Sequence, residues 1–316
     1  MSESVIGNPP LDGAAANSFL ARRYGDRASG AVEIGRGEWA AAYGFMLDGE
    51  ACVARFAAES DDFAKDQLAA AYSSPALPIP RVLEIGEAPG GFYAITERAY
   101  GGHLDALDEA GMRAALPGLF AAFDAMRLTD VSRTSGYGMW DASGNAPHAT
   151  WQQALLALPG DAPTSRIRSW RDRLPAYHAA RAALDEGLAC LRGLVAACPP
   201  GRHLIHSDPL NGNILVAGGS ITAVLDWGCG MYGDFLYDLA HLTFSPCWFP
   251  AWRGIDFAAE AERHYDAIGL DVPLMRERLR CYEIHIGLEA LAYNVFCQRP
   301  AGLDLIVRRT LESVRR

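Results

Sequence analysis

The sequence predicts an α+β fold with two lobes, a small N-terminal lobe built on an antiparallel sheet and a larger C-terminal lobe that is mostly helical. Two patterns predict it. Short apolar runs separated by turn residues occupy the first third of the chain, whereas later segments carry apolar residues at helical spacing. We therefore expect residues 1–100 to form the N-terminal lobe and residues 101–316 the C-terminal lobe. Residues 1–13, rich in Gly, Pro, Ser and Asn, are expected to be flexible.

The N-terminal lobe is expected to contain strands and one helix. Asp48 and Gly49 form a strong hairpin signal between two of the strands. The helix is predicted over residues 62–73, and Pro78 and Pro80 limit it because proline cannot continue a helix. The strands are predicted at residues 31–35, 41–47, 51–56, 81–86 and 91–97.

The C-terminal lobe is expected to be helical, with one strand-rich island. The island covers residues 202–227, where apolar runs flank a polar loop. Gly101 and Gly102 stand at the boundary between the lobes and are typical of a flexible crossing. Helices are predicted at residues 108–127, 177–198, 258–268, 275–298 and 303–314.

Charge and cysteine content narrow the class of protein. A formal net charge of −10 argues against a nucleic-acid partner, which usually requires a basic surface, and suits a cationic substrate. The seven cysteines include no CxxC pair, which argues against a disulfide framework and a zinc site. No apolar run reaches the ~18 residues of a transmembrane helix, and no signal-peptide pattern opens the chain. We expect a cytoplasmic protein without membrane contact that is a monomer or a homodimer.

The island carries the most specific pattern of the chain. A His-x-Asp pair, His206 and Asp208, follows an apolar strand, and Asn213 comes before the next one. A further apolar strand ends in Asp226. Each of these is an ordinary turn residue when it stands alone. Together they indicate phosphoryl transfer, which needs one group to orient a hydroxyl oxygen and others to hold metal against phosphates.

The residue types match those tasks. Asp208 is placed to accept the proton of a substrate hydroxyl and is the predicted catalytic base. His206 is assigned to the catalytic loop together with Asp208, and we expect it to brace the loop and not to take part in the reaction. Asn213 and Asp226 offer the hard oxygen ligands that Mg²⁺ prefers. The array therefore predicts a magnesium-assisted transfer site.

This array resembles the catalytic loop and the metal-binding strand end of the aminoglycoside phosphotransferase and choline kinase superfamily, relatives of protein kinases. The resemblance is closest to its hygromycin B phosphotransferases. It implies a protein-kinase-like fold, ATP and Mg²⁺ as cofactors, nucleotide binding by residues 1–100, and catalysis and substrate binding by residues 101–316. Further similar segments occur in the same order through most of the chain. They are residues 76–86, 134–138, 221–227, 231–234, 237–238 and 286–288.

The resemblance also implies positions for the ATP phosphates. Arg55 stands where the family usually has a lysine, and arginine can bind phosphate bidentately. Asp66, in the next helix, is its expected acidic partner. Lys65, the single lysine of the chain, is either another phosphate ligand or a solvated helix residue. Gly37 belongs to the turn expected to cover the phosphates, which lacks the full glycine pattern of protein kinases.

Two further roles follow from the same resemblance. The backbone of Glu97, Arg98 and Ala99 is expected to contact adenine. Asp234 is expected to tie down the catalytic loop from the following helix, and capping that helix is an equally good interpretation.

The substrate is expected between the catalytic loop and the C-terminal helices. Carboxylates there would pair with ammonium groups, and aromatic rings would stack on sugars or cations. Each candidate also has an ordinary interpretation, the tryptophans in the core and the acidic residues on a solvated face. The candidate substrate contacts are Asn211, Trp248, Trp252, Glu289 and Asp304.

The favoured hypothesis is a phosphotransferase that moves the γ-phosphoryl group of ATP to a hydroxyl of a small cationic molecule, an aminoglycoside such as hygromycin B. One alternative keeps the chemistry and takes a metabolite such as choline, homoserine or a sugar. Another is a non-catalytic nucleotide-binding module with the same fold, against which the intact set of Asp208, Asn213 and Asp226 argues. Residues 244–248 differ from the hygromycin B enzymes, which keeps the identity of the substrate open.

Overall fold

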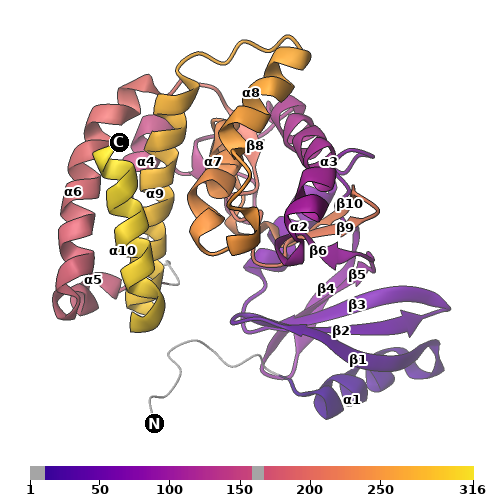
Figure 1. The fold of residues 1–316 in the computed structure, drawn as a ribbon. Coiled ribbons are helices and arrows are strands. Elements are labelled where there is room, and N and C mark those ends of the chain that lie inside the picture. The colour runs from indigo at the N-terminus through magenta and orange to yellow at the C-terminus, as the bar shows by residue number, and fades with distance from the viewer. Residues whose placement is uncertain (1–10, 159–166) are drawn as a thin grey trace.

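The computed structural model describes residues 11–158 and 167–316, arranged in two lobes (Figure 1). The predicted two-lobed α+β arrangement is confirmed, with a sheet-based N-terminal lobe and a helical C-terminal lobe. Of the start predicted to be flexible, residues 1–10 lie outside the described part. Leu11, by contrast, is buried, and the Asp12 carboxylate caps the first helix by accepting a 2.8 Å hydrogen bond from the Ala15 N–H.

The N-terminal lobe is a five-stranded antiparallel sheet in the order β1-β2-β3-β5-β4. Helix α1 (Gly13–Tyr24), which is absent from the prediction, covers its outer face, and α2 (Asp61–Ala70) lies on the side of the C-terminal lobe (Figure 1). Alternate residues of β2, β3 and β5 pack with α1 and form a separate small core. The strands are β1 (Ala28–Arg36), β2 (Ala40–Leu47), β3 (Glu50–Ala57), β4 (Val82–Ala88) and β5 (Gly91–Glu97).

The C-terminal lobe is organised around α9 (Met275–Phe296). This helix is buried over most of its length and packs against α6, α7 and α10. The large core of this lobe extends to Ala69 of α2 and so joins the two lobes. The other helices are α3 (Glu109–Leu128), α4 (Trp151–Leu156), α5 (Trp170–Arg173), α6 (His178–Leu194), α7 (Leu236–Phe244), α8 (Phe257–Ala267) and α10 (Pro300–Arg315).

The five predicted C-terminal helices are confirmed with shifted ends, and α4, α5 and α7 are additional. The predicted helix at residues 177–198 ends earlier, at Leu194, and continues as a short 3₁₀ turn. None of the described helices is long and apolar enough to cross a membrane. Short 3₁₀ helices occur at Gly25–Arg27, Leu104–Ala106, Leu174–Ala176, Val195–Ala197, Trp227–Cys229, Ser245–Cys247 and Pro250–Trp252.

The predicted strand-rich island is confirmed and forms two small sheets, β10-β9-β6 and β7-β11-β8. Strand β6 comes from the crossing between the lobes, so the crossing is pinned to the island. Gly101 is required there, because a Cβ would lie 2.7 Å from Thr222 Oγ1 and 2.9 Å from the Val216 backbone. The strands are β6 (Gly102–His103), β7 (Gly138–Met139), β8 (His203–Ile205), β9 (Ile214–Ala217), β10 (Ser220–Val224) and β11 (Met231–Gly233).

Candidate active site

The loop between β8 and β9 carries the predicted base. Both carboxylate oxygens of Asp208 accept hydrogen bonds from side-chain amides: Asn211 Nδ2 at 2.8 Å and Asn213 Nδ2 at 3.1 Å. Asn213 Nδ2 also donates to the Asp208 carbonyl oxygen at 2.8 Å. The loop thus folds back on itself around Asp208 and fixes the direction of its carboxylate.

His206 joins this loop to the strand that ends at Asp226. Its Nε2–H donates to the Leu225 carbonyl at 2.7 Å, and its Nδ1 accepts from the Asp208 N–H at 3.2 Å. The ring is fully buried, and burial lowers the pKa of His206, so it is neutral near pH 7. These contacts are those of a bracing residue.

The backbone of the site is strained at three non-glycine residues. Ser207 (φ 67°), Asn211 (φ 60°) and Asp226 (φ 58°) adopt left-handed conformations. Such residues cost conformational energy and persist where the surrounding structure imposes them, often at functional sites. Here the hydrogen bonds of the loop supply that constraint.

The loop is tied to α7 by Asp238, not by Asp234. The Asp238 carboxylate accepts the backbone N–H groups of His206 at 2.9 Å and Ser207 at 2.7 Å. Asp234 instead forms a buried ion pair with Arg278, 2.6 Å between Oδ1 and Nη2, and accepts the Tyr282 hydroxyl. The brace predicted at Asp234 therefore belongs to Asp238, one helical turn later. The sequence signal was the Tyr237-Asp238 segment, which resembles the family but carried no assigned role.

A second brace on the other side of the loop was also missed. The Gly212 N–H donates to Asp105 Oδ2 at 2.9 Å, and His103 Nδ1–H donates to the Gly212 carbonyl at 3.0 Å. Both residues come from the crossing between the lobes. They lie more than a hundred positions away in the sequence, so no local pattern could have indicated them.

The environment of Asp208 suits a general base. Burial raises the pKa of the Asp208 carboxyl to about 6. That value already includes a smaller rise caused by the Asp226 and Asp105 carboxylates and the opposing effect of the hydrogen bonds from Asn211 and Asn213. A carboxylate with this pKa binds a proton more strongly than an ordinary aspartate and is still ionised at pH 7.

Asn213 and Asp226 fit a magnesium ion. The Leu225 N–H donates to the Asn213 carbonyl at 2.7 Å, which places the two candidate ligands side by side. The Asn213 amide nitrogen is bound to Asp208, so its oxygen faces the other way, and Asp226 is exposed. Within residues 11–158 and 167–316 there is no cluster of three His, Cys, Asp or Glu side chains that could hold a metal. Two oxygen donors suit Mg²⁺, which keeps water and phosphate ligands.

Arg55 pairs with Asp66, as the sequence predicted. Burial lowers the pKa of Arg55, and the nearby Asp226 and Asp62 carboxylates raise it. The second oxygen of Asp66 accepts the Trp227 N–H at 2.7 Å, so this pair also holds the turn after Asp226.

Lys65 is a positioning group, not a solvated helix residue. Its side chain is buried, and its Nζ donates to the Gly228 carbonyl at 2.8 Å. Lys65 and Asp66, adjacent on α2, thus both bind the backbone that follows Asp226.

Part of the backbone expected to contact adenine is already hydrogen-bonded to neighbouring strands or loops. The Glu97 N–H donates to the Arg81 carbonyl at 3.0 Å, and the Arg98 N–H donates to the Ala51 carbonyl at 3.1 Å. Of the three residues whose backbone was predicted to contact adenine, Glu97 and Arg98 therefore already use their N–H groups. Ala99 and the carbonyl oxygens remain for a base.

The Arg98 side chain lies over Gly44 of β2. A Cβ on Gly44 would sit 2.5 Å from the Arg98 Nη1 atom, so the guanidinium would have to move if a larger residue replaced this glycine. Gly37 lies in the β1–β2 turn, where its N–H donates to the Ala40 carbonyl at 2.9 Å and closes the turn.

Two of the predicted substrate contacts lie near the acidic groups of the site. Asn211 is hydrogen-bonded to Asp208, whereas Glu289 is not. Although the Cys229 side chain is accessible, the surrounding protein raises the pKa of its thiol. The carboxylates that add to this rise are Asp208, Asp226, Asp62 and Glu289. Cys229 therefore lies within the electrostatic reach of all four carboxylates.

The other predicted substrate contacts divide between core and surface. Trp252 is completely buried, stacks on Phe249 at 4.3 Å between ring centroids, and donates to the Leu107 carbonyl at 2.9 Å. Its prediction as a substrate contact is wrong. Trp248 is half-buried against Phe244, and Asp304 is exposed on α10.

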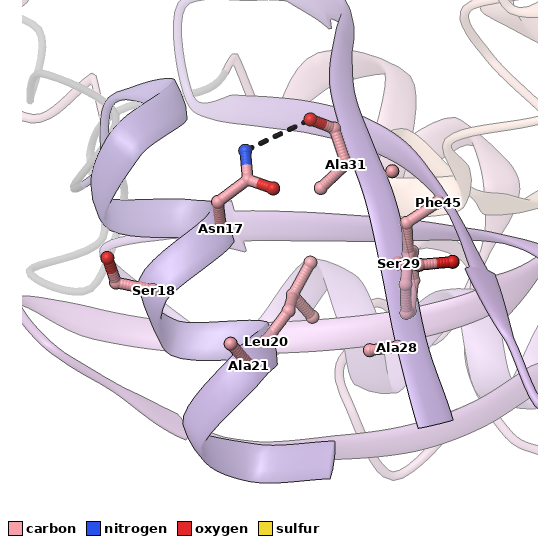
Figure 2. A pocket seen from close by; sticks show the side chains of 9 residues that line it. Asn17, Ser18, Leu20, Ala21, Ala28, Ser29, Ala31 and Phe45 are labelled. Carbon is pink, nitrogen blue, oxygen red and sulfur yellow. Dashed lines mark hydrogen bonds between the residues drawn. The ribbon is translucent and has the colours of Figure 1, made fainter. Parts of the chain in front are cut away.

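A hollow outside the site lacks this chemistry. Figure 2 shows it between α1 and β1, with a volume of about 400 Å³. No ionisable side chain lines it, and its Asn17 amide already donates to the Ala31 carbonyl at 3.0 Å. The reactive groups gather at the Asp208 loop instead.

Comparison with known proteins agrees with this geometry. The model of the phosphotransferase enzyme family matches residues 52–279. Hygromycin-B 4-O-kinase of Escherichia coli is 33% identical over 285 residues, which are 90% of this chain and 80% of that protein. A crystal structure of a thermostable mutant of aminoglycoside phosphotransferase APH(4)-Ia, in a ternary complex with AMP-PNP and hygromycin B, has a TM-score of 0.80 and 30% identity. That match covers 95% of this chain and 98% of the other.

A more distant structure shares the fold alone. The GDP complex of aminoglycoside 2'-phosphotransferase-IIIa has a TM-score of 0.58 at 15% identity and covers 96% of this chain and 99% of the other. The family match over residues 52–279 and the long alignment with the E. coli enzyme lead to one conclusion: this chain belongs to the phosphotransferase enzyme family.

Proposed function

We propose that this protein transfers the γ-phosphoryl group of ATP to a hydroxyl of an aminoglycoside, with hygromycin B as the first candidate. The single observation that carries the proposal is the setting of Asp208. It combines a fixed carboxylate, a pKa of about 6 and the neighbouring pair of oxygen donors, Asn213 and Asp226. The relative at 33% identity acts on hygromycin B, which makes that substrate the first to test.

In the proposed reaction, Asp208 accepts the proton of the substrate hydroxyl as its oxygen forms a bond to the γ-phosphorus. The bond from that phosphorus to the bridging oxygen breaks, and ADP leaves with the bond's electron pair. Arg55 contributes positive charge at the phosphates, and Asp66 holds its guanidinium in place. Mg²⁺, held by Asn213 and Asp226, would neutralise negative charge on the phosphates when bound.

The acidic groups around Cys229 support a cationic substrate. Asp62 lies on α2 and Glu289 on α9, and neither has a role in the phosphoryl transfer itself. Carboxylates in a cleft concentrate and orient ammonium groups, of which an aminoglycoside carries several. The net charge of −10 acts in the same direction.

We further propose a cytoplasmic site of action, where ATP and Mg²⁺ are available, and a monomer or a homodimer as the working form. The proposed reaction is the same for a monomer and a homodimer, because all the residues assigned to it come from one chain.

The test is coupled ATP turnover with Mg²⁺ against a panel of aminoglycosides and against choline, homoserine and simple sugars. Asp208→Asn should lower kcat by about two to four orders of magnitude. Asp48→Asn is the matched control, because Asp48 is an exposed carboxylate that pairs with Arg27 at 2.5 Å in the distant β2–β3 hairpin.

Turnover on hygromycin B that is lost in Asp208→Asn and kept in Asp48→Asn supports the proposal. Turnover on a metabolite but on no aminoglycoside would overturn the substrate and keep the chemistry. Nucleotide binding without turnover on any compound would favour a non-catalytic module.

A further inference from the structure

The turn between β1 and β2 is attached to the C-terminal lobe through Glu38. One Glu38 oxygen accepts the Tyr293 hydroxyl, and the other pairs with the Arg299 guanidinium. Tyr293 is 255 residues away in the sequence, near the end of α9. Each oxygen of one carboxylate therefore has its own partner on the opposite lobe.

The partners are held in place on the C-terminal side. Arg299 lies in the short turn between α9 and α10, where its N–H donates to the Asn294 carbonyl at 3.0 Å. The preceding residue, Gln298, has φ 55°, a left-handed conformation that is unfavourable for a non-glycine residue. A strained turn that presents an arginine to the other lobe indicates a constrained position, not a loose surface contact.

The turn itself is also seated against the C-terminal lobe. Trp39, the residue after Glu38, packs half-buried against the large core that the C-terminal helices build. The hydrogen bond to Glu38 raises the pKa of Arg299, and burial, followed by the same carboxylate, raises the pKa of Tyr293. Packing and charge therefore act together at this contact.

We infer that Glu38, Tyr293 and Arg299 form a latch that holds the β1–β2 turn closed over the nucleotide phosphates during phosphoryl transfer and opens for nucleotide exchange. The inference rests on the proposed function, because it takes this turn as the cover of the ATP phosphates. These three are positioning residues: they act through the backbone near Gly37 and do not touch the reacting atoms. Closure of such a cover excludes water and aligns the phosphates for transfer, and nucleotide leaves once the cover opens.

Steady-state kinetics test the positioning role. Glu38→Gln, Tyr293→Phe and Arg299→Glu should each lower kcat by roughly tenfold, the usual weight of a hydrogen bond to a charged group, with little change in the KM for the aminoglycoside. The double variant Glu38→Arg/Arg299→Glu reverses both charges and should recover kcat relative to Arg299→Glu. Asp48→Asn is the control, because its ion pair with Arg27 lies within one lobe.

Retention of full kcat by Glu38→Gln, or a double variant no better than Arg299→Glu, would overturn the latch. A loss of kcat in proportion to a lowered melting temperature would also overturn it, since that result describes a merely structural contact. Recovery in the charge-reversed pair is an outcome that general destabilisation does not produce.

Nucleotide release tests the latch without any aminoglycoside. A fluorescent ATP analogue, bound with Mg²⁺ and chased with excess ATP, should leave Glu38→Gln and Tyr293→Phe roughly tenfold faster than wild type. Asp48→Asn, whose ion pair with Arg27 lies within one lobe, should keep the wild-type release rate. A wild-type chain with no aminoglycoside turnover contradicts the proposed function alone, and an unchanged release rate in Glu38→Gln contradicts the latch alone.

Discussion

The Trp227 N–H donates a 2.7 Å hydrogen bond to Asp66, the residue that pairs with Arg55. One carboxylate on α2 therefore connects the candidate phosphate ligand on β3 to the backbone directly after Asp226. Lys65, its neighbour on the helix, holds the next carbonyl, that of Gly228. The position of α2 thereby couples the nucleotide side of the site to its metal side.

Asp66→Asn should weaken ATP binding because the amide keeps an acceptor for Trp227 and loses the charge that holds Arg55. We expect the KM for ATP to rise roughly 10- to 100-fold, with a smaller change in the KM for the aminoglycoside. Asp61→Asn, an exposed carboxylate in the first turn of the same helix, is the control. Equal effects of the two substitutions on the KM for ATP would contradict the coupling.

The pH dependence should follow the raised pKa of Asp208. Since the base must be ionised to accept a proton, kcat/KM should be flat near pH 7–8 and fall about tenfold per unit below pH 6. A profile from pH 4.5 to 8 at constant ionic strength measures this. An acid limb centred near 4, the ordinary value for aspartate, would show that burial does not perturb Asp208.

Substitutions of Asp238 and Asp234 should distinguish an effect on the catalytic loop from an effect on the stability of the core. Asp238→Ala leaves the His206 and Ser207 N–H groups buried without their acceptor, so the folded protein should lose activity and about 2–4 kcal/mol of unfolding free energy. Asp234→Asn disturbs the buried pair with Arg278 and should cost about 3–5 kcal/mol while the folded fraction keeps most of its kcat. Urea unfolding and kcat corrected for the folded fraction give both quantities. A lower kcat in Asp234→Asn than in Asp238→Ala would show that Asp234, not Asp238, braces the catalytic loop.

Trp252 should behave as a core residue. Trp252→Phe removes the hydrogen bond to Leu107 and leaves a small cavity, at a cost of about 1–3 kcal/mol in unfolding free energy. The KM for the aminoglycoside should not change. Trp248→Phe is the comparison, since its half-buried ring is still a candidate for substrate contact. A raised KM in Trp252→Phe alone would show that the core assignment is incorrect.

The sequence by itself determined the features that depend on near neighbours. The strands of the N-terminal sheet, the strands within the island that carries His206 to Asp226, and six of the ten described α-helices follow from local periodicity and spacing, and they lie close to where they were predicted. The pairing of Arg55 with Asp66 was also predicted, from the resemblance to the phosphotransferase family.

Only the tertiary structure decided which of several chemically similar residues reaches the site. Asp234 and Asp238 are four positions apart, and the docking of α7 on the catalytic loop gave the brace to the second. Trp252 was equally suited to a sugar ring and to the core until the packing of Phe249 enclosed it. Glu38 and Tyr293 meet across the two lobes, and neither residue type nor spacing indicates a partner that distant, because the contact depends on how separately folded elements are placed in space.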